Sequence, residues 1–283
     1  MTDSAPLSAE VPLSHLEPEE KARRARSFGG AASAYERYRP GPPLAAVEWM
    51  LPTHVARVVD LGAGTGALTR LLPDRADEVV AVEPDDRMRA VLEEEVPTAR
   101  ALAGRGEAIP LPDGSVNAVV ASSSWHWMDP VLTFREVRRV LAPGGTLAAV
   151  WSGPDPDGAL MTQAKEILAA RGSGGSGGDG DGDLAGLILG DGSRPVSTLE
   201  VPSEVNFARP DQEVFSWDMA LSADEILGIL STMSWIITLP DDARQRVIDQ
   251  ARELLKDVLG IEGEVTIDVG FKAQAWLTRP NPG

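Results

Sequence analysis

Short apolar runs alternate with segments of helical periodicity between residues 55 and 151. The runs ARVVDL, EVVAVE, VNAVVA and GGTLAAVWS predict buried β-strands. Between them, apolar residues recur at the three- and four-residue spacing of an amphipathic helix, at Leu68, Leu71 and Leu72; Met88, Val91 and Leu92; and Phe134, Val137 and Leu141. The alternation predicts an α/β fold in which helices cover both faces of a mostly parallel sheet.

The second half of the chain contains fewer and more scattered elements. The run EVFSWDMALS predicts a strand, and Ser222 with Glu225 has the spacing of a capping box for the helix that follows. A second helix is expected from Pro240 to about Gly260, and GFKAQAWLTR predicts a closing strand. Between the two halves, the glycine-rich residues 172–183 predict a flexible linker.

These patterns predict five parts of the chain. Residues 1–26 lack periodicity and are expected to form a mobile tail, and residues 27–54 are expected to form short helices. Residues 55–153 form the expected ligand-binding core. Residues 154–240 are expected to be an insert with a helical cap, and residues 241–283 to supply the last helix and strand.

The composition narrows the classes of partner. The formal net charge is −17 and the isoelectric point about 4.6, so the surface repels phosphate backbones and anionic lipid. The chain has no cysteine, which excludes disulfides, thiolate metal sites and a cysteine nucleophile. No apolar run reaches the length of a membrane span. We therefore expect a soluble, cytoplasmic protein that binds neither nucleic acid nor membrane, while the oligomeric state stays open.

The Asp-Gly alternation near residue 180 suggests a calcium loop, but its spacing does not fit one. A helix-loop-helix calcium site that starts at Asp179 requires glycine at position 184 and glutamate at position 190. The chain has Leu184 and Gly190 at these positions. No acidic cluster elsewhere in the sequence predicts a magnesium site, so we expect no metal.

The strongest chemical motif is VVDLGAGTGALTR, in which a strand ends at Asp60 and a glycine-rich turn follows. Glycines let a ligand approach the backbone closely, and Gly62, Gly64 and Ala67 also match the dinucleotide pattern G-x-G-x-x-G/A. A nicotinamide-dependent oxidoreductase therefore stays open. The Asp60 carboxylate disfavours it, because a carboxylate repels a pyrophosphate but binds an amine. Glu83, which closes the next strand, is placed to accept hydrogen bonds from ribose hydroxyls.

Together these segments resemble the class I S-adenosylmethionine-dependent methyltransferases, and within them the small-molecule group of trans-aconitate-like or type 11 methyltransferases. The resemblance covers about residues 28–151 and returns loosely over 213–279. It implies a Rossmann-like, seven-stranded sheet whose last strand is antiparallel. It also implies S-adenosylmethionine as cofactor, S-adenosylhomocysteine as product, and methyl transfer to a small molecule, with oxygen favoured. A protein that binds the cofactor without transferring methyl, such as a regulator or a cyclase, stays open.

The resemblance also implies site residues in this chain. Its cofactor contacts fall on Tyr35, Arg39, Asp60, Gly62, Ala63, Gly64, Glu83, Pro84, Met88, Gly106, Glu107, Ala108 and Ser122. By the same resemblance, residues 27–54 would form a lid that, with the insert, covers one edge of the sheet and forms the acceptor pocket. The acceptor pocket would be lined by Tyr38, Trp125, Trp127, Trp217 and Met233. Ordinary core packing is the alternative interpretation for the aromatic residues and for Met233.

His126 lies between two tryptophans in the stretch SSSWHWMDP, directly after the strand VNAVVA. Ligands of open parallel sheets bind beyond the carboxyl ends of the strands, and this stretch follows such an end. His126 is therefore the candidate catalytic residue, either as the base that takes a proton from the acceptor or as a group that orients it. Two other roles stay open, namely pocket lining without proton transfer and a purely structural hydrogen bond.

Overall fold

The computed structural model describes residues 28–163, 166, 198–261 and 265–282. Within this part of the chain, one seven-stranded sheet has the order β3-β2-β1-β4-β5-β7-β6. The strands are β1 (Val55–Leu61), β2 (Ala76–Val82), β3 (Arg100–Leu102), β4 (Val116–Ser122), β5 (Leu141–Pro154), β6 (Asp211–Ser222) and β7 (Thr266–Thr278). All neighbours are parallel except β7, which is antiparallel to both β5 and β6. The predicted Rossmann-like sheet with an antiparallel last strand is confirmed.

The carboxyl ends of the central strands meet at one edge of the sheet. β1 lies between β2 and β4, so Asp60 is beside Ala81 on one side and Val120 on the other. At the next boundary, Ser122 of β4 is beside Val150 of β5. Because these strands run parallel and in step, the residues that follow β1, β2, β4 and β5 gather at this edge.

The described α-helices are α2 (Ala32–Tyr38), α3 (Leu44–Met50), α4 (Asp86–Glu95), α5 (Pro130–Val140), α8 (Ala223–Ser231), α9 (Ser234–Ile237) and α10 (Asp241–Leu259). Shorter 3-10 segments are η2 (Phe28–Ala31), η3 (Thr69–Leu71) and η4 (Trp125–Trp127). The predicted capping box of Ser222 with Glu225 is confirmed. At the start of α5, the Asp129 side chain accepts the Leu132 N–H. Gly260 ends α10 in the left-handed conformation, with φ 64°.

The sheet is packed on both faces, as its continuous apolar strands require. On one face, Phe134 and Val137 of α5 are fully buried against the strands. On the other face, Val47 and Met50 of α3 are buried in a second cluster. The two layers leave the strand ends as the place where polar groups can meet a ligand.

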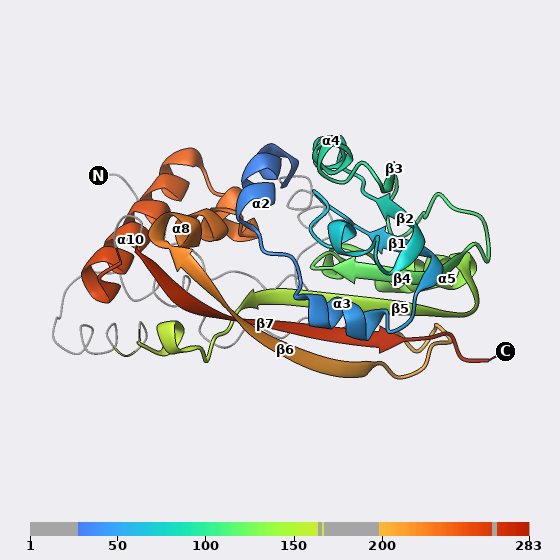
Figure 1. Cartoon of the computed structure of the whole chain (residues 1–283). Helices are drawn as coiled ribbons and strands as arrows, with labels where there is room; N and C mark the ends of the chain where they lie inside the picture. The colour runs from blue at the N-terminus through green and yellow to red at the C-terminus, as the bar shows by residue number, and fades with distance from the viewer. Residues whose placement is uncertain (1–27, 164–165, 167–197, 262–264, 283) are drawn as a thin grey trace.

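The long strands β6 and β7 extend past the central strands and carry α8 and α10 at one end of the molecule (Figure 1). We call α8, α9 and α10 the helical cap. Its own core contains Leu227, Val247 and Leu255. α2 lies between the cap and α4 and contacts both. The N-terminal helix thus joins the cap to the part of the sheet that carries the glycine turn.

Two local predictions were wrong or incomplete. The helix expected through Leu68, Leu71 and Leu72 is only the 3-10 turn η3, because Gly66 has φ 99° within the segment and Pro73 follows it. Leu68 and Leu72 are nevertheless buried, so their apolar spacing reflects packing and not an α-helix. The short strand β3 was not predicted. The expected tail at 1–26 and linker at 172–183 lie outside the described residues.

Candidate active site

The glycine turn after β1 is pressed against the end of β2 and the loop after β4. Gly62 and Gly64 have φ of 70° and 59°, a conformation that favours glycine. The backbone N–H of Gly62 donates to the Val82 carbonyl at 2.8 Å. A Cβ on Gly62 would lie 2.6 Å from the Cβ of Ser124. Only glycine therefore fits at position 62, even before any ligand is considered.

Glu83, directly after β2, holds the turn from the other side. Its carboxylate accepts the Gly64 N–H through Oε2 and the Asp85 N–H through Oε1, each at 2.9 Å. The residue is 7% exposed, and burial raises the pKa of its carboxyl. Met88 lies next to it, with Cε 3.5 Å from where a Cβ on Gly64 would stand. Each carboxylate oxygen has a second lone pair, so Glu83 can still accept hydrogen bonds from a ligand.

Asp60 is almost completely buried at the end of β1. Its Oδ2 accepts the hydroxyl of Thr69 at 2.7 Å, while Oδ1 has no hydrogen-bond partner among the described residues. Burial, together with the nearby Glu83 carboxylate, raises the pKa of Asp60 to about 7, although the Thr69 hydrogen bond opposes the rise. A buried carboxylate with an unmatched oxygen is costly unless a cation or a donor compensates it. The pair of acids fits a ligand that carries an ammonium group and hydroxyls.

His126 lies in η4, immediately after a sharp turn at the end of β4. Ser123 has φ 51°, and the Ser124 hydroxyl donates to the Leu61 carbonyl at 2.7 Å, which ties this loop to the end of β1. The indole Nε1–H of Trp151, on β5, donates to Nδ1 of His126 at 2.9 Å. The imidazole is therefore held by β5 while its loop is held by β1.

The two tryptophans that flank His126 have different surroundings. Trp125 is 5% exposed and packs edge-on against Phe134 in the core, with ring centroids 5.1 Å apart. Trp127 is half-buried, and its ring centroid is 4.9 Å from that of His126. The position of Trp127 suits a pocket wall, whereas Trp125 anchors the loop in the core.

Comparison with known proteins agrees with a ligand site formed by the glycine turn and the acids at the strand ends. The family described as "Methyltransferase domain" matches residues 59–149. Uncharacterized methyltransferases of Mycobacterium bovis and Mycobacterium tuberculosis are 38% identical over 229 residues, which cover 81% of this chain and 85% of theirs. An uncharacterized methyltransferase-like protein of Schizosaccharomyces pombe is 25% identical over 91% of this chain and 96% of its own. A solved structure of a proposed type II methyltransferase from Anaeromyxobacter dehalogenans covers 87% of this chain and all of its own, with 21% identity and a TM-score of 0.58.

The chain belongs to the class I S-adenosylmethionine-dependent methyltransferases. The mycobacterial relatives carry this conclusion, because their identity extends over most of both chains. The solved structure supports the fold alone.

In this methyltransferase, the loop that contains the expected cofactor contacts Gly106, Glu107 and Ala108 is packed against the start of α5. A Cβ on Gly106 would lie 2.5 Å from Sδ of Met128, so the backbone there is in close contact. Glu107 accepts the Asp129 N–H through Oε1 at 2.7 Å, and Ala108 closes a small turn with the carbonyl of Arg105. Pro84 follows the end of β2, and Ser122 is the last residue of β4, at the same edge of the sheet.

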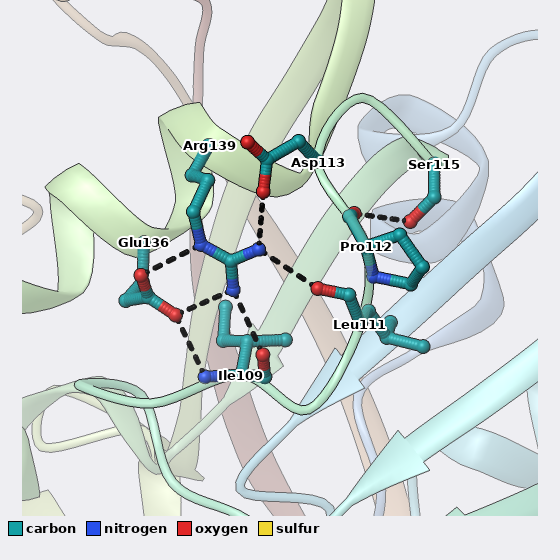
Figure 2. A network of polar contacts seen from close by, with 7 residues as sticks. All are labelled: Ile109, Leu111, Pro112, Asp113, Ser115, Glu136 and Arg139. Atoms are coloured by element: carbon teal, nitrogen blue, oxygen red, sulfur yellow. Dashed lines mark hydrogen bonds and ion pairs between the residues drawn. The ribbon is translucent and has the colours of Figure 1, made fainter.

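An arginine on α5 holds the next part of this loop (Figure 2). Arg139 donates to the carbonyls of Leu111 at 2.8 Å and Ile109 at 2.9 Å. It also pairs with Asp113 at 2.8 Å and with Glu136 at 2.7 Å. Glu136 in turn accepts the Ile109 N–H at 3.0 Å. The network connects residues 109–113 to the helix that follows the His126 loop.

The expected lid residues separate into two environments. The Arg39 guanidinium lies 5.7 Å from the Tyr35 ring centroid, and its Nη1 is 4.0 Å from Sδ of Met233. Tyr38 instead packs on α8, so closely that a Cβ on Gly228 would lie 2.3 Å from its ring. The lid helix thus contacts the cap through Tyr38 and places Tyr35 and Arg39 together near Met233.

Trp217 on β6 stacks on Phe271 of β7, with ring centroids 5.4 Å apart and an interplanar angle of 28°. Both residues belong to the cluster that also packs against Tyr38. This placement puts Trp217 in the packing between the long strands and the lid.

Several residues at this edge carried no signal in the sequence. Trp151 lies within an apolar strand, Thr69 lies in a leucine pattern, and Ser124 ends a serine run. Gln274 is opposite Trp151 in the strand register, and its buried Oε1 has no partner among the described residues. Only the folded chain shows that Thr69, Ser124 and Trp151 form hydrogen bonds with Asp60, Leu61 and His126, respectively.

Within the described residues, no three His, Asp or Glu side chains gather in a way that would hold a metal ion. No helix in that part of the methyltransferase has both the length and the apolar surface needed to cross a membrane.

Proposed function

We propose that this methyltransferase binds S-adenosylmethionine at the ends of β1 and β2 and transfers its methyl group to a small molecule, with oxygen as the favoured atom. The observation that carries the proposal is the pair of buried acids on either side of the glycine turn. Asp60 keeps one buried oxygen without a partner among the described residues, and Glu83 braces Gly64 while retaining acceptor capacity.

The buried acids and the glycine turn would hold different parts of the cofactor. Asp60 would face the ammonium group of the cofactor. The positive charge of this group would compensate the buried Asp60 carboxylate, which has no cationic partner among the described residues. Glu83 would accept from the ribose hydroxyls. Gly62, Ala63 and Gly64 would lie along the methionine part. The bound cofactor supplies an activated methyl group on a cationic sulfur.

The remaining predicted cofactor contacts surround these groups. On the adenine side they are Pro84, Met88, Gly106, Glu107 and Ala108. Ser122 would lie beside the sulfonium, and Tyr35 and Arg39 would close over the cofactor from the lid.

The acceptor would bind beyond the ends of β4 and β5. His126 and Trp127 lie in the loop there, and Met233 comes from the cap side with Arg39. Tyr38 and Trp217 would shape the pocket through the packing of the lid on the long strands. Oxygen is favoured by the resemblance to the trans-aconitate-type group and by the hydrogen-bonding imidazole at this position.

Thermal unfolding with and without ligand tests the cofactor. S-adenosylhomocysteine at a hundred times its Kd should raise the free energy of unfolding by about 2.7 kcal/mol, whereas NAD should have no effect. Stabilisation by NAD alone would overturn the proposal.

Transfer is tested with methyl-labelled S-adenosylmethionine and a panel of small carboxylic acids, phenols and amines. Label should appear in an oxygen-linked product. Cofactor binding without transfer to any of these acceptors would favour a binding protein instead.

A further inference from the structure

Trp151 reaches from the end of β5 to the imidazole of His126 in the neighbouring loop. Its Nε1 is 2.9 Å from Nδ1 of His126, and the two ring centroids are 6.4 Å apart with planes inclined by 30°. Trp151 is held in turn by an edge-on contact with Trp276, whose centroid lies 5.1 Å away. The indole is therefore a fixed hydrogen-bond partner for His126.

An indole N–H can donate a hydrogen bond but cannot accept one. The nitrogen that receives it, Nδ1 of His126, must therefore present a lone pair. A neutral imidazole carries only one proton, so that proton must be on Nε2. Placing a proton on Nδ1 would set two N–H groups against each other and would break the bond to Trp151.

We propose that Trp151 is a positioning residue that keeps neutral His126 in the tautomer with its proton on Nε2. Any contact that His126 makes with an acceptor through Nε2 is then a donated hydrogen bond. In this state His126 cannot take a proton through Nε2, so it orients the acceptor and does not act as its base. The tautomer follows from the geometry, and only its consequence for the acceptor rests on the proposed function.

The consequence concerns the protonation state of the acceptor. In the transfer, an oxygen lone pair forms the new O–CH₃ bond, while the S–CH₃ bond breaks and its electron pair returns to sulfur. An acceptor that arrives as an oxygen anion leaves no proton to remove, and a positive and a negative charge are lost together. His126 therefore suits an acceptor that is already ionised when it binds, because a neutral hydroxyl would need a base that this tautomer does not provide.

Nuclear magnetic resonance on ¹⁵N-labelled protein tests the tautomer without any acceptor. At about pH 8 the unperturbed imidazole is neutral, and the chain has three histidines, so His126→Asn identifies the His126 signals. We expect a scalar coupling across the hydrogen bond between Nε1 of Trp151 and Nδ1 of His126, together with a protonated Nε2. Trp151→Phe removes the donor but keeps an aromatic ring, and should abolish the coupling. Trp49→Phe, a tryptophan replacement in α3, should retain it.

A protonated Nδ1 in the wild-type protein, or no coupling to Trp151, would overturn the inference. The wild-type spectrum decides this even if Trp151→Phe fails to fold. Calorimetric titration of the same wild-type sample with S-adenosylhomocysteine separates the two proposals. Failure to bind this probe would overturn the proposed function and leave the tautomer result unaffected.

Discussion

The ends of β1 and β2 differ from the ends of β4 and β5 in how they satisfy their polar groups. At the first pair, Asp60 and Glu83 are buried carboxylates with raised pKa values, and one oxygen of Asp60 lacks a partner among the described residues. At the second pair, His126 and Trp151 satisfy each other through a hydrogen bond between two neutral rings.

This difference shows two ways of preparing a ligand site. In the ligand-free protein, the buried negative charge of the acid pair is not fully compensated, which costs free energy. A cationic ligand can compensate this charge when it binds. The ring pair is already satisfied, so its contribution is a fixed orientation. Removal of the Asp60 charge should therefore raise stability and lower ligand affinity, whereas changes at the second pair should alter the orientation of the imidazole.

The largest effect is expected from Asp60→Asn. The pKa of Asp60 is raised from 3.8 to about 7 on folding, so between these pH values the folded protein binds more protons than the unfolded chain. The free energy of unfolding therefore falls as pH rises through this window. Replacing Asp60 by Asn should remove this decline and stabilise the free protein above pH 7, by at most about 4 kcal/mol.

Urea unfolding of wild type and Asp60→Asn from pH 5 to pH 8 measures this difference. Glu94→Gln, at an exposed position on α4, makes the same charge change and should leave the pH dependence as it is in wild type. The same Asp60 variant should bind S-adenosylmethionine more weakly. If Asp60→Asn is less stable than wild type at pH 8, the buried Asp60 charge is not a cost to the free protein, and the contrast with the His126–Trp151 pair is wrong.

Glu83→Ala should weaken binding of S-adenosylhomocysteine by roughly tenfold to a hundredfold, because hydrogen bonds to a charged group contribute about 1.5–3 kcal/mol. The loss should be near the upper end, since the part-buried Gly64 N–H also loses its acceptor. Glu83→Gln keeps one carbonyl oxygen for Gly64 and should lose less. Isothermal titration calorimetry measures both, and equal affinity in all three proteins would remove Glu83 from the cofactor site.

Gly228→Ala should separate the lid from the cap. A Cβ at this position would lie 2.3 Å from the ring of Tyr38, and such overpacking costs about 1–3 kcal/mol. Alanine would otherwise favour helix α8 by up to about 1 kcal/mol, so a net loss of stability identifies the Tyr38 contact. Gly153→Ala, where a Cβ has open space, is the control. Thermal unfolding compares the two, and a stabilised Gly228→Ala would show that the lid does not pack there.

Arg139→Met should have the smallest effect of the four. It removes the bonds to Ile109 and Leu111 that connect the loop to α5, at a cost of about 1–2 kcal/mol in unfolding free energy. Cofactor affinity should fall only a few-fold, because Arg139 acts on residues 109–113 and not on the strand ends. Arg135→Met, exposed on the same helix, should be neutral. An equal loss in both variants would indicate a general effect on α5.

Much of the fold could be predicted from local patterns. The valine-rich runs, the glycine turn after Asp60, and the caps at Asp129 and Ser222 all depend on neighbours within a few residues. Asp60, Glu83 and His126 could be proposed as site residues in the same way, because parallel strands bring their carboxyl ends to one edge. The other candidate site residues came from the family resemblance. β3 was not predicted because three residues are too few to show a period. An α-helix was wrongly predicted at η3 because the burial of its leucines alone produces a helical spacing.

The sequence by itself determined which strand ends carry acids, glycines and the histidine, because short-range sterics and periodicity specify each element. Tertiary structure decided which polar groups meet. Trp151 is 25 residues from His126, and Tyr38 is far in sequence from Gly228, yet each pair is in contact. Such pairs depend on strand order and register, which no local pattern encodes. Hence the acid at the end of β1 could be predicted from the chain, whereas the proton position on His126 follows only from the neighbour that folding supplies.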